Sequence, residues 1–279
     1  MKVITSVVNT DFIEIQFLSF KRFLKNDFEF IVFNDAKNFK DSTNNFQLGM
    51  KQNVFDLCNK LNITCINHDN DFHLNLNGAS FRHASVLNKM LQFQLNNPDK
   101  YLYVDSDIFL IDYLDIHKYN DFPCAVVLQY RFFNNSHLHY IWPGLCYFDM
   151  SKIVLPHLLN WNLQCGCDTG GMTMQWLISQ NRSTSFPSCT DIRHSSSTFH
   201  NQFIYFIKHL WSCTWNIDEL PTNLYQYPSL ISFLRNDPRN NSNLIFAEIY
   251  DDVFLHLRSG SSYNDLSSFL LFMQEFLKN

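Results

Sequence analysis

The order of apolar and polar positions predicts alternating strands and helices in the first part of the chain. Residues 3–9 and 28–33 are apolar runs of strand length, and residues 11–24 between them place apolar side chains at helical spacing. A strand, a helix and a strand in this order form a βαβ unit. Such a unit predicts a parallel sheet whose ligands bind at the carboxyl ends of the strands.

The same alternation continues into an apolar run at residues 101–111, which has Asp105 and Asp107 at its centre. A strand buried on both faces cannot neutralise two carboxylates, so we expect both acids where the strand ends. Residues two apart on an extended chain point to the same side, so the acids can bind one hard cation, with Ser106 turned away. The alternative is that they only end the strand and cap a turn.

The remaining elements are expected as follows. Helices are expected over residues 53–61, 80–95, 173–180 and 199–211, and the third is opened by residues 168–171, with Asp168 or Thr169 as its N-cap; a last helix contains residues 269–273. Strands are expected over residues 63–66, 124–129, 144–150, 244–249 and 253–257. A polar aromatic segment at 130–142 interrupts the pattern, and 186–197 and 221–243 are expected to be loops. We predict one α/β domain with a mixed, mainly parallel sheet flanked by helices.

Composition narrows the class of protein. Aromatic residues make up 16% of the 279 positions and 28 of them are Phe, so we expect an interior built largely from rings. The net charge is −5 and the basic residues are scattered along the chain, so nucleic acid is not an expected partner. No signal peptide and no apolar segment of membrane-spanning length is visible, which predicts a soluble, cytoplasmic protein with reduced cysteines.

Five motifs together resemble the nucleotide-diphospho-sugar transferases with the GT-A fold, most nearly glycosyltransferase family 8. They are the helix segment Arg82-His83-Ala84-Ser85-Val86-Leu87-Asn88-Lys89-Met90, the strand end Asp105-Ser106-Asp107, the strand Gly144-Leu145-Cys146-Tyr147-Phe148-Asp149, the turn Asp168-Thr169-Gly170-Gly171 and the late segment His256-Leu257-Arg258-Ser259-Gly260. The resemblance covers most of the chain. It implies a GT-A domain over residues 1–279, with a nucleotide-sugar-binding half at 1–111 and an acceptor-binding half at 112–279.

The resemblance also implies site residues. In such enzymes the acid pair and a late histidine hold Mn²⁺ or Mg²⁺, a role that would belong here to Asp105, Asp107 and His256. The residues expected to bind a UDP- or GDP-linked sugar are Asn9, Asp35, Asn88, Asp105, Ser106, Arg258 and Gly260. Asp168, with Asp149 ranked below it, is the acid expected beside the reacting sugar, either binding hydroxyls or acting as general base. The acceptor would be a hydroxyl of a glycan or glycoconjugate.

Each assignment has a structural alternative. His256 in an apolar strand could be a packed core residue, Asp168 a helix cap, and Asp35 or Asn9 a turn former. Trp142 could be a platform for the acceptor or a core residue. The late segment departs from the family, because Gly260 is followed by Ser261 and not by a Lys-Pro-Trp sequence. Arg258 is the cation that could replace the missing lysine.

Other functions share parts of this pattern. A nucleotidyltransferase should have a Gly-rich loop soon after its first strand, whereas the first glycine here is Gly49. A phosphohydrolase with an Asp-x-Asp nucleophile normally has its acids after the first strand. A catalytically silent sugar-binding relative is the third alternative, which the presence of all four residues Asp105, Asp107, Asp168 and His256 argues against.

Overall fold

Two β-sheets organise the chain in the computed structural model, and each sheet belongs to its own compact unit. The structure describes residues 1–37, 49–69, 78–164, 166–188, 192–193, 199–200, 203–258 and 266–278. The first unit consists of Met1–Asp11, Asp27–Ser106 and His117–Ile207, and the second of Phe12–Asn26, Asp107–Ile116 and Lys208–Asn279. The chain therefore passes repeatedly from one unit to the other.

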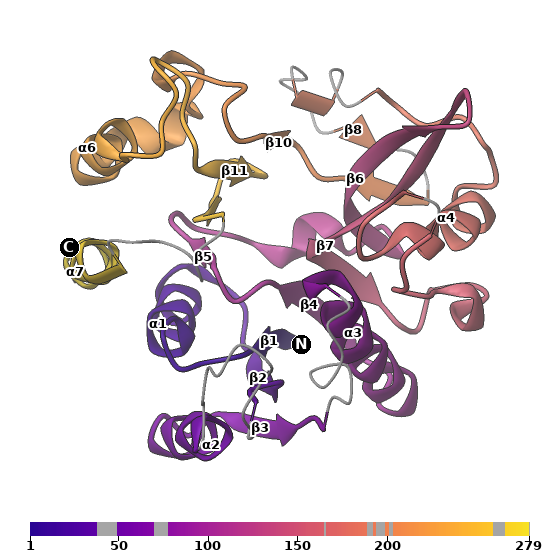
Figure 1. The fold of residues 1–279 in the computed structure, drawn as a ribbon, viewed down its shortest axis with the longest axis horizontal. Coiled ribbons are helices and arrows are strands. Elements are labelled where there is room, and N and C mark those ends of the chain that lie inside the picture. The colour runs from indigo at the N-terminus through magenta and orange to yellow at the C-terminus, as the bar shows by residue number, and fades with distance from the viewer. Residues whose placement is uncertain are drawn as a thin grey trace. The chain divides into compact units, whose positions relative to one another are not determined.

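The first unit contains an eight-stranded sheet with the order β3-β2-β1-β4-β7-β6-β9-β8 (Figure 1). Its strands are β1 (Lys2–Val7), β2 (Glu29–Asn34), β3 (Thr64–Asn67), β4 (Lys100–Val104), β6 (Cys124–Phe133), β7 (Ser136–Asp149), β8 (Phe199–His200) and β9 (Ile204–Phe206). Four pairs are parallel, namely β3 with β2, β2 with β1, β1 with β4, and β6 with β9. The predicted mixed, mainly parallel α/β sheet is confirmed.

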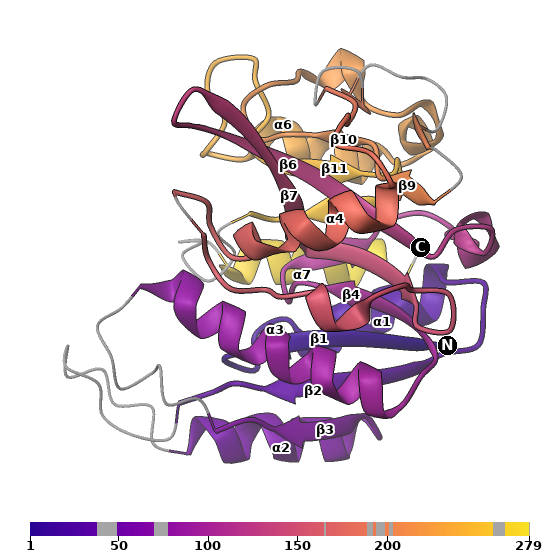
Figure 2. The ribbon, with the colours of Figure 1, turned by 90° about the vertical axis from the view of Figure 1, so that its right-hand side faces the viewer.

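The helices of this unit are α2 (Met50–Lys60), α3 (Ala79–Asn96) and α4 (Met174–Asn181), with short 3₁₀ turns η3 (Pro156–Leu158) and η4 (Gly171–Thr173). Figure 2 shows α3 and α4 in front of the strands of the large sheet. The buried face of α3 supplies Val86, Leu87, Met90 and Leu91 to the core, as its amphipathic pattern predicted. The helix therefore covers β1 and β2, whose Ile4 and Ile31 belong to the same core.

The aromatic segment at 130–142 is not an interruption of the fold but the end of a long hairpin. Strands β6 and β7 pair from Cys124 to Phe133, with a register shift between Val126 and Val127. The side chain of Trp142 lies over Gly144, where an added Cβ would come within 2.0 Å of the indole ring. Glycine therefore permits the close approach of this ring to the backbone.

The second unit contains a four-stranded antiparallel sheet with the order β10-β11-β12-β5. Its elements are α1 (Ile13–Phe23), β5 (Ile108–Leu110), β10 (His209–Leu210), η5 (Ile217–Glu219), η6 (Thr222–Gln226), α6 (Pro228–Asn236), β11 (Glu248–Tyr250), β12 (Phe254–His256) and α7 (Leu266–Phe276), and η2 (Ile116–Tyr119) lies where the chain returns to the first unit. Phe12 packs edge to face against Phe109 and Phe269, and the rings of Phe109 and Phe269 are tilted against each other, with centroids 5.1–5.9 Å apart. The expected ring-rich interior is confirmed here.

The apolar run at 101–111 is divided between the two sheets. Strand β4 ends at Val104 and pairs with β1 and β7, whereas β5 begins at Ile108 and pairs with β12. Asp105 directly follows the first strand and Asp107 directly precedes the second. The prediction is confirmed for Asp105, which lies where β4 ends, whereas Asp107 lies where the next strand begins.

Three expectations about the second half of the chain were wrong. The segment 199–211 forms strands β8, β9 and β10 in place of a helix, and 221–243 contains α6. The turn at Asp168 does not cap a helix, because α4 begins only at Met174 after η4.

None of the helices within the described ranges is long and apolar enough to cross a membrane. The assignment of 1–111 and 112–279 to donor and acceptor stays a prediction.

Candidate functional site

Polar residues gather at the carboxyl edge of the parallel strands in the first unit. Asn9 follows β1, Asp35 follows β2 and Asp105 follows β4, and these strands are parallel neighbours in the order β2-β1-β4. The chain leaves β1 toward β2 on one side and returns to β4 on the other. Open α/β sheets bind ligands at such a switch of direction, so this edge is where a nucleotide would be expected.

A tyrosine and a histidine hold Asp105. The Tyr103 hydroxyl donates to Oδ1 of Asp105 at 2.5 Å, and Nε2 of His83 lies 3.2 Å from the same oxygen. Burial alone would lower the pKa of His83, but the Asp105 carboxylate outweighs burial and raises the pKa above its usual value. His83 lies in the helix segment of the family resemblance, but the sequence indicated no role for it.

The first turn of α3 also contacts Asp168. The Ser80 hydroxyl donates to Oδ1 of Asp168, and the Thr169 hydroxyl donates to the Ser80 carbonyl at 2.9 Å. Ser80 and His83 are three positions apart, so they lie on the same side of the helix. One turn of α3 therefore contacts both Asp168 and Asp105, two of the acids that the sequence singled out.

Three other predicted residues in this unit have local partners. Asn9 donates to Asp11 at 2.8 Å, and the backbone N–H of Asp35 donates to the Val7 carbonyl at 2.8 Å. The Asn88 amide donates to Asn162 at 2.9 Å and accepts from a backbone N–H at 3.1 Å. These contacts orient the side chains of Asn9 and Asn88 and fix the backbone at Asp35. Their roles toward a nucleotide stay predictions, as does that of half-buried Ser106.

Asp149 lies at the other end of the sheet from Asp105. In the antiparallel pair of β4 and β7, Asp149 is opposite Lys100, whereas Leu145 is opposite Val104. Four residues along a strand span roughly 13 Å. Asp149 is 3% exposed and accepts from the Ser151 hydroxyl at 2.6 Å. The register gives no support to the predicted catalytic role of Asp149, and we leave it out of the proposed site.

In the second unit, Asp107 contacts the late histidine that the sequence proposed as its partner. Nε2 of His256 lies 3.4 Å from Oδ1 of Asp107, and the Leu257 N–H donates to the Asp107 carbonyl at 2.9 Å. Strand β12 pairs directly with β5, which sets His256 opposite Ile108. Pairing of these two strands thus brings together residues that are far apart in the chain.

A buried glutamate, which the sequence did not indicate, lies behind His256. Oε2 of Glu248 is 2.7 Å from Nδ1 of His256, and the Glu248 side chain is only 4% exposed. Burial alone would lower the pKa of His256, but Asp107 and Glu248 outweigh burial and raise it to about 10. Burial works against ionisation of Glu248 as well, yet the His256 contact holds the Glu248 pKa below its usual value. The only feature of the sequence that could have pointed to Glu248 is the position of this acid within an apolar strand.

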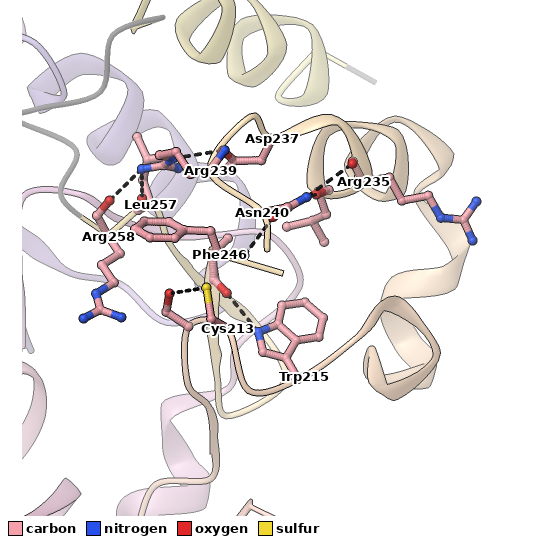
Figure 3. A network of polar contacts seen from close by, with 12 residues as sticks. Cys213, Trp215, Arg235, Asp237, Arg239, Asn240, Phe246, Leu257 and Arg258 are labelled. Atoms are coloured by element: carbon pink, nitrogen blue, oxygen red, sulfur yellow. Dashed lines mark hydrogen bonds and ion pairs between the residues drawn. The ribbon is translucent and has the colours of Figure 1, made fainter. Parts of the chain in front are cut away.

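The segment after β12 is held by an arginine that the sequence also did not indicate. Arg239 donates to the carbonyls of Leu257 at 2.9 Å and Arg258 at 2.7 Å, and its guanidinium pairs with buried Asp237 at 2.7 Å (Figure 3). Arg258 has φ 37°, and its Nη1 lies 3.5 Å from Glu248 Oε1 with half of the side chain exposed. Gly260 lies outside the described residues.

Two side chains of the second unit are of the kinds that can ligate a metal ion. Asp107 and His256 offer a carboxylate oxygen and an imidazole nitrogen, a donor set that suits Mn²⁺. Nδ1 of His256 is bound to a carboxylate, as is usual for histidines that ligate metals. Within the described ranges, no group of three His, Cys, Asp or Glu side chains is arranged to hold a metal ion. The adjacent oxygen of Asp107 and nitrogen of His256 are chemically suited to a metal ion. These two of the three predicted ligands belong to the second unit.

Comparison with known proteins gives matches only among solved structures. Those named here are glycosyltransferases. GlyE of Streptococcus pneumoniae is 13% identical over 69% of this chain and 46% of its own, with a TM-score of 0.39. The bifunctional glycosyltransferase WbbM is 14% identical over 67% of this chain and 38% of its own, with a TM-score of 0.39. LgtC, in complex with donor and acceptor sugar analogs, is 11% identical over 99% of this chain and 96% of its own, with a TM-score of 0.40.

No family model matches the chain, and no curated protein does. The chain spans less than half the length of GlyE and of WbbM. At identities of 11–14% and TM-scores of 0.40 or below, we base no functional conclusion on these structures.

Proposed function

We propose that the protein is a metal-dependent glycosyltransferase, which moves a sugar from a nucleotide-diphosphate sugar to an acceptor hydroxyl. The observation that supports this most is the pair formed by Asp107 and His256. Nε2 of His256 lies 3.4 Å from Asp107, while Nδ1 on the other side of the ring contacts the carboxylate of Glu248. An isolated Asp-x-Asp has many structural uses. A histidine from a distant strand on one of its acids is what a cation site needs.

The proposed metal ligands are Asp107, His256 and Asp105, the last being two positions before Asp107 in the chain. When bound, Mn²⁺ or Mg²⁺ would stabilise the negative charge that develops on the leaving diphosphate. Arg258 would bind the same phosphates, because half of its side chain is exposed and Glu248 anchors it close to His256. Its guanidinium can offer two parallel donors to phosphate oxygens.

Asp168 is proposed to act on the sugar. Its carboxylate is exposed, and Ser80 and the Thr169 N–H both donate to Oδ1, the second at 2.8 Å. These contacts orient the carboxylate through one oxygen. The side chain could then accept hydrogen bonds from sugar hydroxyls, or take the proton of an acceptor hydroxyl. The nucleoside would bind at the carboxyl edge that includes Asn9 and Asp35.

The test is a calorimetric screen of UDP- and GDP-linked sugars with and without Mn²⁺, followed by an assay for nucleoside diphosphate release. We expect binding of one donor to depend on the metal, and EDTA to abolish turnover, which added Mn²⁺ restores. The proposal would be contradicted if none of these donors bound at millimolar concentration in the presence of Mn²⁺. Turnover that persists in EDTA would contradict its metal-dependent part.

A further inference from the structure

Glu248 is placed to control which nitrogen of His256 is available. The two residues lie directly opposite each other in the antiparallel pair of β11 and β12. Oε2 of Glu248 is 2.7 Å from Nδ1, while Nε2 on the other side of the ring is 3.4 Å from Asp107. Both side chains are at most 8% exposed, so water cannot easily replace either partner.

The other neighbours of Glu248 are two hydrogen-bond donors and a cation. The Ser212 N–H donates to Oε1 at 3.1 Å, the Tyr250 hydroxyl donates to Oε2 at 2.5 Å, and Arg258 pairs with Oε1 at 3.5 Å. A carboxylate with such neighbours acts only as an acceptor. Nδ1 of His256 must therefore bear the proton in the hydrogen bond to Glu248.

We infer that Glu248 is a positioning residue, which holds His256 with Nδ1 protonated and so directs the Nε2 lone pair toward a divalent cation shared with Asp107. The inference rests on the proposed function, because it assumes that His256 is a metal ligand. Glu248 itself does not touch the metal in this arrangement. Its effect is on the tautomer and on the orientation of the ring, which together set the strength of the ligand.

An amide at this position cannot replace the carboxylate. If the oxygen of a glutamine faced Tyr250 and His256, its NH₂ would face the Ser212 N–H, and two donors would meet. If it turned around, the NH₂ would face Nδ1 and force that nitrogen to accept. Nε2 would then bear the proton and could not bind a metal. Glu248→Gln therefore disturbs the proposed role with almost no change in side-chain volume.

The experiment measures Mn²⁺ affinity of the full chain without any sugar nucleotide, by the electron paramagnetic resonance signal of free Mn²⁺. We expect Glu248→Gln to bind Mn²⁺ about 10–100-fold more weakly than the original protein, the range found for residues that support metal ligands. His256→Gln should weaken binding at least as much. The matched control is Glu219→Gln, the same change at an exposed glutamate of the second unit, which should leave affinity within about twofold.

A second measurement uses the unaltered protein, so it does not depend on whether Glu248→Gln folds. Long-range ¹H–¹⁵N spectra of the unaltered protein loaded with diamagnetic Mg²⁺ report the tautomer of His256. We expect the proton on Nδ1 and the metal on Nε2. A proton on Nε2 in the loaded protein would overturn the inference, whatever the stability of Glu248→Gln.

The outcomes separate the inference from the proposed function. If the original protein binds no Mn²⁺, the metal-dependent function fails and the inference fails with it. If His256→Gln binds Mn²⁺ as well as the original protein does, the inference is overturned while a site made by the two aspartates remains. If His256→Gln weakens binding and Glu248→Gln does not, only the role of Glu248 is overturned.

Discussion

The two aspartates of Asp105-Ser106-Asp107 each contact an imidazole, but the two pairs are built differently. His83 uses one nitrogen, Nε2, for both Asp105 at 3.2 Å and the Tyr103 hydroxyl at 3.0 Å. His256 uses its two nitrogens separately, Nε2 for Asp107 and Nδ1 for Glu248. The first arrangement forms a hydrogen-bond network around an acid, whereas the second resembles the carboxylate-supported imidazole of metal sites.

The pairs also differ in exposure. The side chain of His83 is 28% exposed and that of His256 is 8% exposed. His83 comes from the first turn of a helix in the first unit, and His256 from the end of a strand in the second. A similar contact between acid and histidine can thus serve to hold an acid in place or to prepare a ligand. The second contact of the ring distinguishes the two.

Removal of the charge of Asp107 should have the largest effect. Asp107→Asn leaves His256 with one carboxylate in place of two and deprives the cation of an anionic ligand, so activity should fall at least about 100-fold. The measurement is release of nucleoside diphosphate at saturating Mn²⁺. Asp121→Asn, at an exposed acid, is the control and should retain activity. Full activity of Asp107→Asn in EDTA would show that the acid does not act through a metal.

The two histidines should differ in their effect on metal affinity. We expect His256→Gln to weaken Mn²⁺ binding about 10–100-fold, because a ligand is lost, and His83→Gln to weaken it less, because Asp105 keeps its hydrogen bond from Tyr103. Both variants are measured by the same titration with Mn²⁺ alone. An equal loss in both would remove the distinction between the two pairs.

The arginine that holds the end of β12 should affect stability. Arg239→Lys replaces a planar fork by a point charge, so it cannot keep the two contacts to Asp237 together with the carbonyls of Leu257 and Arg258. We expect the free energy of unfolding in urea to fall by about 1–3 kcal/mol. The control Arg235→Lys changes an exposed arginine, which points away from this network in Figure 3, and should cost less than about 0.5 kcal/mol. Equal losses would mean that the network does not stabilise the strand end.

The smallest effect is expected at Asp149. It lies at the end of the sheet away from Asp105, so Asp149→Asn should change turnover by less than about threefold. The amide can still accept from the Ser151 hydroxyl, which preserves the local turn. Turnover reduced 100-fold, in a variant that melts normally, would restore the catalytic role that the sequence suggested.

Much of the first unit could be predicted because its signals are local. Residues 80–95 show one apolar face and do form α3, and the strand before Asp105 ends where two charges follow an apolar run. The segment 199–211 could not be read in the same way. Its apolar residues belong to very short strands, such as β9 with three residues, and short runs have no reliable period. Pairing with other strands decides their conformation, β9 with β6 and β10 with β11.

The candidate site divides along the same line. Asp105 and Asp107 could be proposed from their residue types and local context, and His256 from the family resemblance. Glu248, Arg239 and His83 could not, because their roles depend on which residue lies opposite them in space. The sequence of a short apolar strand does not show what Glu248 contacts. Pairing of β11 with β12 places Glu248 opposite His256.

The sequence by itself determined that two carboxylates interrupt an apolar run and that a late histidine follows a second short strand. The tertiary structure alone decided that this run divides between two sheets, so that Asp105 meets His83 and Asp107 meets His256. The physical reason is the range of the interactions. Side-chain period and strand ends follow from neighbours in the chain, whereas the partners of buried charges follow from strand pairing, and desolvation then makes those partners obligatory.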